Sequence, residues 1–368
     1  MSFKITLSTS KIKTAHNCSW LYWVKYGPTR LPDASNSGAK TGSIVHIVLE
    51  CLAVNKRRKL AEKIIKSRDP FHGKACQGIK HLVYKWARKL DIDTPEHIDK
   101  IKTFIVNGLS HDFWGEDRGK PIATYTEKDF DFEVDGRYKT RGFIDRLFIY
   151  AGGHALIRDY KSSKSTYCGS ESTTENHQGS NYCLAVREMS GKGLIPKVTS
   201  VSVEFLFLKF DCSLESKWET GIYQGRETKK LYHNGGGRIT LNYDWAEIAG
   251  FEYELEADQQ YLENFTEEDA AKNFAADKPD PSDGSFGGKM MCGFCSQPGE
   301  LKKDGSPKYS CAARWPFNYY HILNKDDNSF VASCFLHERE KLEYKYPHDR
   351  YLWIEKSYGG CKRWMKNS

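Results

Sequence analysis

The chain has 368 residues, of which 39% are hydrophobic and 28% charged, and its formal net charge is +7. That length suffices for a large hydrophobic core in one domain or two. Every apolar run is shorter than the roughly 18–20 residues of a membrane span, and the first residues lack the apolar stretch of a signal peptide. We therefore expect a cytoplasmic protein with no membrane partner. The mild positive charge is compatible with a polyanionic partner but does not establish one.

The first third of the chain has the apolar spacing of helices. Ser8 or Ser10 can cap the first of them, and Gly27 can end it. The Asp69-Pro70 step interrupts the helical pattern further along. The predicted helices cover residues 8–27, 42–67, 74–90 and 95–113.

From Ile122 the hydrophobic period changes to two, which predicts three successive antiparallel strands at residues 123–134, 138–151 and 154–162. The elements expected after them are a helix at 175–188, a strand at 198–210, a short strand at 217–224 and a helix at 245–265. This order predicts an α/β core with a helical N-terminal elaboration. We expect one domain over residues 1–368, made of a mainly helical part at 1–120, the α/β core at 121–270 and a cysteine-rich region at 271–368.

The second and third strands each carry an aspartate among apolar residues. If residues 151–153 form a three-residue hairpin loop, Asp145 lies opposite Asp159, and Lys161 shares the face of Asp159. A two-residue turn at Gly152-Gly153 would instead pair Arg146 with Asp159. Two adjacent carboxylates repel each other unless a cation or a proton separates them, and such a pair suits Mg²⁺ or Mn²⁺. The alternative is a buried Asp–Lys or Asp–Arg ion pair, with Arg141, Arg146 and Arg158 close by.

Four short motifs in this order resemble the PD-(D/E)XK nuclease superfamily, specifically its RecB-like branch. They are the segment from Gly142 to Arg146 (GFIDR), the segment from Asp159 to Lys161 (DYK), the segment from Gln178 to Tyr182 (QGSNY), and His46 on an upstream helix. The resemblance runs from about Leu7 to Arg314. It implies a restriction-endonuclease-like core, which is a central mixed sheet flanked by helices.

The resemblance also implies residue roles. His46, Asp145, Asp159 and the Tyr160 carbonyl would bind Mg²⁺ or Mn²⁺, and Lys161 would be the catalytic lysine. Gln178 would act at the catalytic site, and Gln178 and Tyr182 would support it or contact the nucleic-acid strand. Further expected nucleic-acid contacts are Arg141 and Lys164, and Glu127 is a weaker candidate for the metal.

The chain has 11 cysteines, which in the cytoplasm should be reduced or bound to metal. Cys292 and Cys295 form a C-x-x-C pair, with Cys311 further on. One interpretation is a structural Zn²⁺ site completed by Cys334 or His337. The other is a [4Fe–4S] cluster, as in a subset of RecB-like nucleases similar to the AddB nuclease domain, the CRISPR-adaptation nuclease and eukaryotic exonuclease V. That resemblance implies the ligands Cys18, Cys292, Cys295 and Cys311, and leaves as ordinary residues Cys51, Cys76, Cys168, Cys183, Cys212 and Cys361.

These features together predict a metal-dependent DNA nuclease, and more specifically an exonuclease acting on single strands or free ends in repair, recombination or phage DNA processing. Its setting would be the cytoplasm of a bacterial or phage-infected cell. No G-x-x-x-x-G-K-[S/T] motif occurs, so any helicase partner would be a separate chain. The alternatives are a structure-specific endonuclease on the same fold, a catalytically silent nucleic-acid-binding module, and a zinc-stabilised interaction protein.

Overall fold

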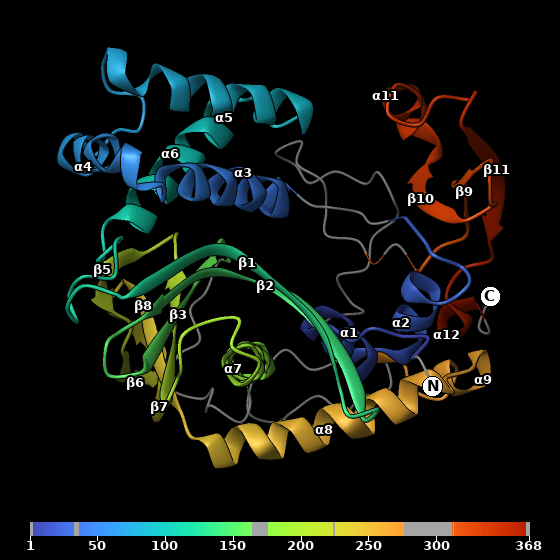
Figure 1. Cartoon of the computed structure of the whole chain (residues 1–368). Coiled ribbons are helices and arrows are strands. Elements are labelled where there is room, and N and C mark those ends of the chain that lie inside the picture. Colours follow the sequence, from blue (N-terminus) through green and yellow to red (C-terminus); the bar gives the residue numbers. More distant parts are fainter. Residues whose placement is uncertain are drawn as a thin grey trace. The chain divides into compact units, whose positions relative to one another are not determined.

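The computed structural model describes residues 3–32, 37–163, 176–223, 225–275, 311 and 313–365 (Figure 1). The chain packs into two compact units. Unit 1 contains Met1–Thr6 and Ser37–Gln259, and unit 2 contains Leu7–Asn36 and Gln260–Ser368. The single nuclease domain expected from the sequence stays a prediction, and each unit is described by itself.

Unit 1 is built on a mixed six-stranded sheet with strand order β1-β2-β3-β4-β8-β5. The β3–β4 and β5–β8 pairs are parallel and the others are antiparallel, so the predicted mixed α/β core is confirmed. Strands β5 and β8 were not expected from the sequence. The bounds are β1 Ala123–Val134, β2 Tyr138–Ile149, β3 His154–Lys161, β4 Ser200–Phe207, β5 Asp211–Glu215 and β8 Gly236–Tyr243.

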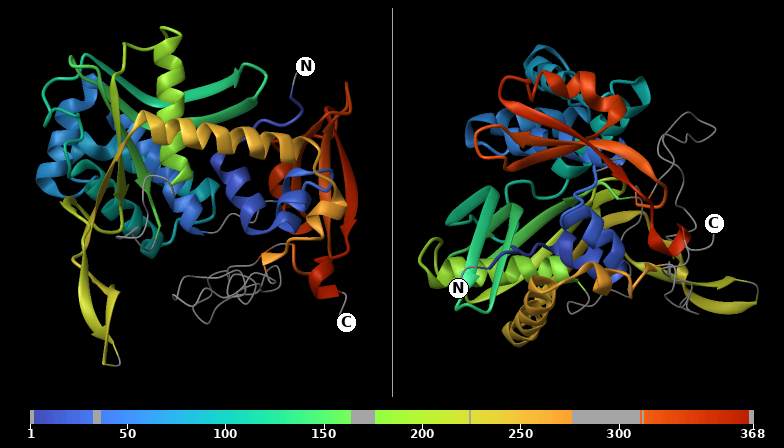
Figure 2. Two further views of the ribbon diagram at one scale, coloured as in Figure 1. Left: turned by 90° about the horizontal axis from the view of Figure 1, so that it is seen from below. Right: turned by 90° about the vertical axis from the view of Figure 1, so that its right-hand side faces the viewer.

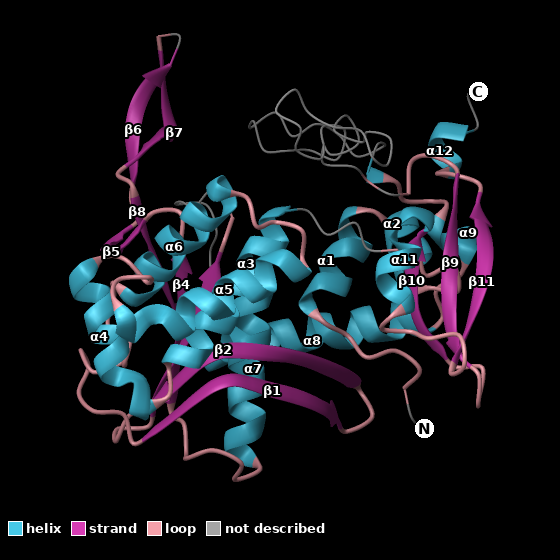
Figure 3. Ribbon diagram, turned by 90° about the horizontal axis from the view of Figure 1, so that it is seen from above, coloured by secondary structure: helices cyan, strands magenta, loops and turns pink. Residues whose placement is uncertain are grey.

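A separate hairpin, β6 (Trp218–Tyr223) with β7 (Arg226–His233), is inserted between β5 and β8. Figures 2 and 3 show this two-stranded ribbon projecting from the end of the sheet where β5 and β8 lie. Only the strand at 217–224 was predicted from the sequence.

Helices cover both faces of the sheet (Figure 1). On one face lie α3 Ser37–Leu52, α4 Arg58–Ser67, α5 Gln77–Lys89 and α6 Pro95–Leu109. Their apolar residues form one core with Tyr160, Leu206 and Leu208 of the sheet region. On the other face lies α7 (His177–Gly191), and α8 (Trp245–Glu263) follows β8.

The prediction of one helix over residues 42–67 is wrong, because the chain forms two helices, α3 and α4, with a break at Val54. The backbone of Val54 is extended, at φ −74° and ψ 128°. Arg57 supplies a physical reason, since its guanidinium donates a 2.7 Å hydrogen bond to the Cys51 carbonyl in the last turn of α3. No single described helix is long and apolar enough to cross a membrane, and α3 passes such a test only jointly with Asn55–Ser67, from which it is bent by 96°.

Unit 2 combines two N-terminal helices with a C-terminal three-stranded sheet of order β10-β9-β11. The helix predicted over residues 8–27 is also wrong as one piece: α1 (Thr9–Asn17) and α2 (Ser19–Tyr26) are separated at Cys18, whose backbone is extended. Ser8 caps α1 and Gly27 follows α2, as predicted. The other elements are α9 Glu267–Ala270, β9 Phe317–Asn324, β10 Phe330–Phe335, α11 Arg339–Glu343, β11 Tyr351–Tyr358 and α12 Lys362–Met365.

Candidate active site

The β2–β3 hairpin has the register that the sequence predicted. Paired residues run from Ile149 with Ala155 to Arg146 with Arg158, and the Tyr150 amide donates to the His154 carbonyl at 3.0 Å. The loop therefore comprises residues 151–153, and the continued register sets Asp145 opposite Asp159.

The two strands stop pairing where the aspartates begin. The recorded ladder ends at Arg146 and Arg158, although both strands extend further. Beyond it, the Tyr160 amide donates a 2.7 Å hydrogen bond to Asp145 Oδ2. The Asp145 carboxylate thus takes the place of a backbone acceptor, which fixes it between the strands.

Glu127 adds a third carboxylate from β1. Thr126 pairs with Arg146 and Lys128 with Ile144, so Glu127 lies opposite Asp145. Its φ is +46°, in the left-handed region that non-glycine residues rarely adopt. Such strain concentrates at functional sites. Glu127, Asp145 and Asp159 thus form a row across three strands, which we call the acidic fork.

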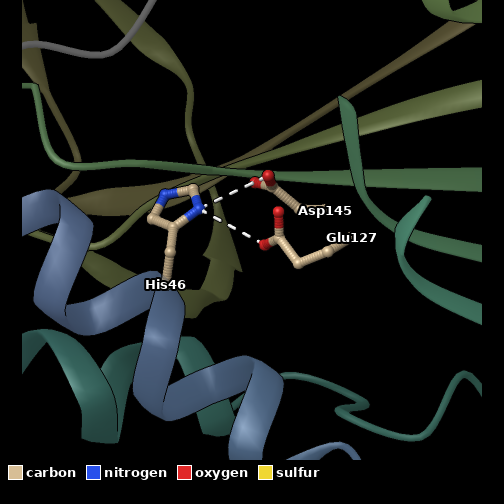
Figure 4. Close-up of side chains that lie close together, drawn as sticks. All are labelled: His46, Glu127 and Asp145. Atoms are coloured by element: carbon tan, nitrogen blue, oxygen red, sulfur yellow. Dashed lines mark ion pairs between the residues drawn. The ribbon is translucent and has the colours of Figure 1, made fainter. Parts of the chain in front are cut away.

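His46 of α3 faces Glu127 and Asp145 of this row (Figure 4). Its Nδ1 lies 3.4 Å from Asp145 Oδ1 and 3.9 Å from Glu127 Oε1, and its Nε2 lies 3.0 Å from the Tyr160 carbonyl oxygen. Ligand atoms of His46, Glu127 and Asp145 all lie within 4.8 Å of one another. One imidazole and two carboxylates at this spacing are donors that suit a divalent cation.

The electrostatics of the acidic fork favour a cation. Burial raises the pKa of Glu127 to about 7, with Asp145 adding to the rise and His46 opposing it. Burial lowers the pKa of His46, but the hydrogen bond and charge of Asp145 outweigh this effect and raise it to about 9. Burial also raises the pKa of Asp159, against the charge of Lys161. Without a metal, the carboxylates therefore hold a proton on His46.

Asp159 is held by three side chains. Lys161 Nζ lies 2.8 Å from its Oδ2, while Gln178 Nε2 and the Tyr182 hydroxyl donate to its Oδ1 at 3.1 and 2.8 Å. The Gln178 carbonyl oxygen accepts a hydrogen bond from Lys161 Nζ. Gln178 therefore bridges the aspartate and the lysine and orients both. Tyr182 is buried, and its hydroxyl points to Asp159.

The buried ion pair considered as the alternative is present in its lysine form, since Lys161 Nζ lies 2.8 Å from Asp159 Oδ2, whereas the arginines pair elsewhere. Arg158 donates to Glu204 Oε2 at 2.6 Å and to the Asp112 carbonyl at 2.7 Å. Arg146 lies over the rings of Phe113 and Phe148. Since neighbouring strand residues point to opposite faces, neither arginine shares the face of Asp159. The third arginine, Arg141, is exposed on β2 opposite Asp131, and Lys164 lies outside the described residues.

Two glycines permit this packing. Gly142 pairs with Phe130, and a Cβ on it would stand 2.6 Å from the Phe130 ring. Gly42 of α3 would place a Cβ 2.7 Å from Ser162 Oγ. The close approach of α3 to the end of β3 brings His46 to Tyr160.

The predicted cluster cysteines are only partly described. Cys292 and Cys295 lie outside the described residues. Cys18 and Cys311 both lie in unit 2 and pack against one apolar core. Cys334, an expected zinc ligand, is buried on β10, where burial and the charge of Glu338 raise its pKa to about 11. The ring of His337 stacks on Phe335. The cluster and the zinc site both stay predictions.

Comparison with known proteins gives three matches. One relative is a component of the ATP-dependent helicase/deoxyribonuclease of Streptococcus mutans, 26% identical over 175 residues; the match covers 44% of this chain but 14% of that protein. A crystal structure from Eubacterium rectale, provisionally described as an exonuclease, aligns at 10% identity with a TM-score of 0.39, over 70% of this chain and 81% of that one. The family model of the PD-(D/E)XK nuclease superfamily matches residues 6–298. The chain therefore belongs to the PD-(D/E)XK nuclease superfamily.

Proposed function

We propose that this protein is a Mg²⁺- or Mn²⁺-dependent DNA nuclease, and more specifically an exonuclease on single strands or free ends. The observation that carries the proposal is the acidic fork, with His46 on one side and Lys161 on the other. Family membership supports phosphodiester hydrolysis. The name of the Streptococcus mutans relative supports DNA as the substrate and a helicase as a possible partner in a separate chain.

The donor set fits a hard divalent cation. His46, Glu127 and Asp145 would hold it, with Asp159 and the Tyr160 carbonyl adjoining them. A cation bound there would supply Lewis acidity for attack on a phosphodiester. The raised pKa of Glu127 reflects the same crowding of negative charge that a cation would relieve.

Asp159 and Gln178 position the ammonium group of Lys161. Lys161 Nζ is held by Asp159 and Gln178, which fixes a positive charge at the end of β3. There it would stabilise the negative charge that develops on a phosphate in the transition state. Tyr182 and Gln178 lock the orientation of Asp159. Their role is positioning, and a direct contact of Tyr182 with nucleic acid is not needed. Arg141 and Lys164 remain proposed strand contacts.

The test is digestion of 5′- and 3′-labelled single-stranded and duplex DNA with Mg²⁺ or Mn²⁺. Wild type is compared with Asp159→Ala and with the control Asp129→Ala, which removes an exposed carboxylate from β1. We expect metal-dependent cleavage by wild type and the control, and none by Asp159→Ala. Circular single-stranded DNA separates the modes, because an exonuclease leaves it intact and an endonuclease opens it. Equal activity of all three proteins would refute the proposed site.

A further inference from the structure

The positive charge of the chain is concentrated in one segment of unit 1, residues 54–90. This segment contains 12 lysines and arginines but only two acidic residues, Glu62 and Asp69. The whole chain has 55 lysines and arginines and 48 acidic residues, so the remainder contains 43 and 46. The segment therefore accounts for all of the excess positive charge.

The segment forms the outer part of the helical layer of unit 1. Figure 1 shows α5 on the outside of this layer, with α3 and α6 between it and the sheet. In α4, Ala61 and Ile64 are buried, and the exposed Lys59, Lys63 and Lys66 recur at helical spacing on the opposite face. We call the exposed lysines of α4 and of the region that follows it the lysine surface: Lys59, Lys63, Lys66, Lys74, Lys80 and Lys85.

The acidic residues near the lysine surface pair with other cations. Glu62 lies 3.1 Å from Arg58, which also pairs with Glu116 at 2.6 Å. Asp69 lies 3.5 Å from Lys102 of α6. Within the described part of the chain, no carboxylate forms an ion pair with a member of the lysine surface, so its charge is left for a partner outside the protein.

The aromatic rings of the segment favour a duplex over a single strand as that partner. Proteins that hold single strands stack the bases on exposed aromatic rings. The Phe, Tyr and Trp rings of residues 54–90 all pack against the core of the helical layer: Phe71, Tyr84 and Trp86. A duplex keeps its bases stacked inside and presents one phosphate charge per about 1.7 Å of its axis. Lysines bind such a backbone without needing access to the bases.

The burial of α4 argues against a membrane surface. A helix that lies on a membrane inserts its apolar face among the lipids. The apolar face of α4 is already used, because Ala61 and Ile64 are 0% exposed in the core of unit 1. The charged face of α4 is what remains available to a partner.

We propose that the lysine surface holds the duplex part of a DNA substrate by its phosphate backbone. His46 lies six residues before Leu52, the last residue of α3, which is about 9 Å along the helix axis. The helix that carries His46 thus leads from the acidic fork toward the lysine surface. This inference rests on the proposed nuclease function and narrows its substrate to duplex DNA with a free end. The lysine surface and the acidic fork share no residue, so either proposal can fail while the other stands.

Binding without cleavage tests the lysine surface separately from catalysis. The full chain is titrated in EDTA, at several KCl concentrations, with a labelled duplex and with a labelled single strand of the same length. The α4 variant replaces three exposed lysines by glutamine, which keeps helix propensity: Lys59→Gln, Lys63→Gln and Lys66→Gln together. The control removes the same charge from exposed lysines of unit 2: Lys325→Gln, Lys345→Gln and Lys356→Gln together.

We expect the α4 variant to bind the duplex about 100-fold more weakly than wild type at about 0.1 M KCl. The slope of its log K against log[KCl] should be shallower by about 2–3, because each lost phosphate contact removes about 0.9. The control should bind as wild type does, and the single strand should be affected less than the duplex.

Duplex binding by the α4 variant at wild-type strength would overturn the proposal, and so would an equal loss for duplex and single strand. Wild type that binds anionic phospholipid vesicles but not the duplex would assign the surface to a membrane instead. Lysine-dependent duplex binding by a wild type that does not cleave DNA with Mg²⁺ or Mn²⁺ would support the lysine surface and refute the nuclease function alone.

A second measurement needs no variant. Lysines of wild type are acetylated in EDTA with and without the duplex, and the modified residues are identified by mass spectrometry. Lys59, Lys63 and Lys66 should be protected by the duplex, while Lys325 and Lys345 react equally in both samples. Equal acetylation of the three α4 lysines in both samples would contradict the proposal even if the α4 variant failed to fold.

Discussion

The two faces of β3 carry charge in different ways. On one face, Asp159 and Lys161 join Asp145 and Glu127, and the carboxylates outnumber the lysine. On the other face Arg158 pairs with Glu204, and His111 binds the same carboxylate at 3.2 Å. We call Arg146, Arg158 and Glu204, with their neighbours His111 and Asp112, the arginine face.

The two faces differ in whether the protein itself neutralises their buried carboxylates. On the arginine face, Glu204 has cationic partners in the protein, and burial alone would raise its pKa, yet Arg158 and His111 lower it to about 2. In the acidic fork, the pKa of Glu127 rises to about 7. Buried carboxylates are stable where partners neutralise them, whereas excess negative charge needs a cation from outside.

The largest expected effect is on catalysis in the acidic fork. Asp145→Asn keeps an acceptor for the Tyr160 amide but removes one negative charge. We expect cleavage to fall on the order of 10³-fold, since an electrostatic contribution to the transition state is lost. The metal-free thermal midpoint should change little, because the loss of the ion pair with protonated His46 offsets the relief of carboxylate repulsion. A midpoint lowered well below that of Asp129→Asn would show that Asp145 is structural.

Next in size is a stability effect on the arginine face. Arg158→Met leaves Glu204 buried without its closest cation, so unfolding in urea should show a loss of about 3–5 kcal/mol. Adding Glu204→Leu should recover most of that loss, because an apolar pair replaces an ion pair. Metal-dependent cleavage by the folded double variant should persist. A double variant as unstable as Arg158→Met would show that the stability of the arginine face does not depend on charge pairing.

The smallest effect is a pH dependence of stability. The folded pKa of Glu204 is about 2 against an ordinary value of 4.5, so its contribution is present above pH 4.5 and is lost as the pH falls toward 2. That difference corresponds to about 3 kcal/mol. Urea midpoints of wild type and Glu204→Gln should therefore differ most above pH 4.5 and converge near pH 2. Parallel curves across that range would contradict the lowered pKa.

Local signals in the sequence were enough to predict the hairpin, with two registers left open by the length of its loop. The register depended on the loop length, because a two-residue Gly152-Gly153 turn would have paired Arg146 with Asp159, and the structure has the three-residue loop that sets Asp145 against Asp159. The breaks at Cys18 and Val54 were missed because both lie within helical periodicity, and the second is accompanied by a local side-chain hydrogen bond from Arg57 to the Cys51 carbonyl. Propensity does not report such contacts.

Other features depend on residues distant in the sequence. In the sequence, Glu127 resembles an exposed strand residue. The register of β1 on β2 places it opposite Asp145, in the candidate metal site. The missed strands β9 and β11 carry aromatic residues on both faces, which hides the alternation that predicts a strand.

In unit 2, the indole Nε1 of Trp20 donates a 2.9 Å hydrogen bond to the Tyr358 hydroxyl, which closes a loop of 338 residues, within which the whole sheet of unit 1 is made. Contacts so distant in sequence form late, since the entropy of closing the loop is spent before they contribute. During synthesis, α1 and α2 leave the ribosome long before β11 exists. We therefore expect unit 1 to fold first, while α1 and α2 remain undocked and Trp20 stays exposed. Folding of unit 1 would then shorten the effective loop between Trp20 and Tyr358.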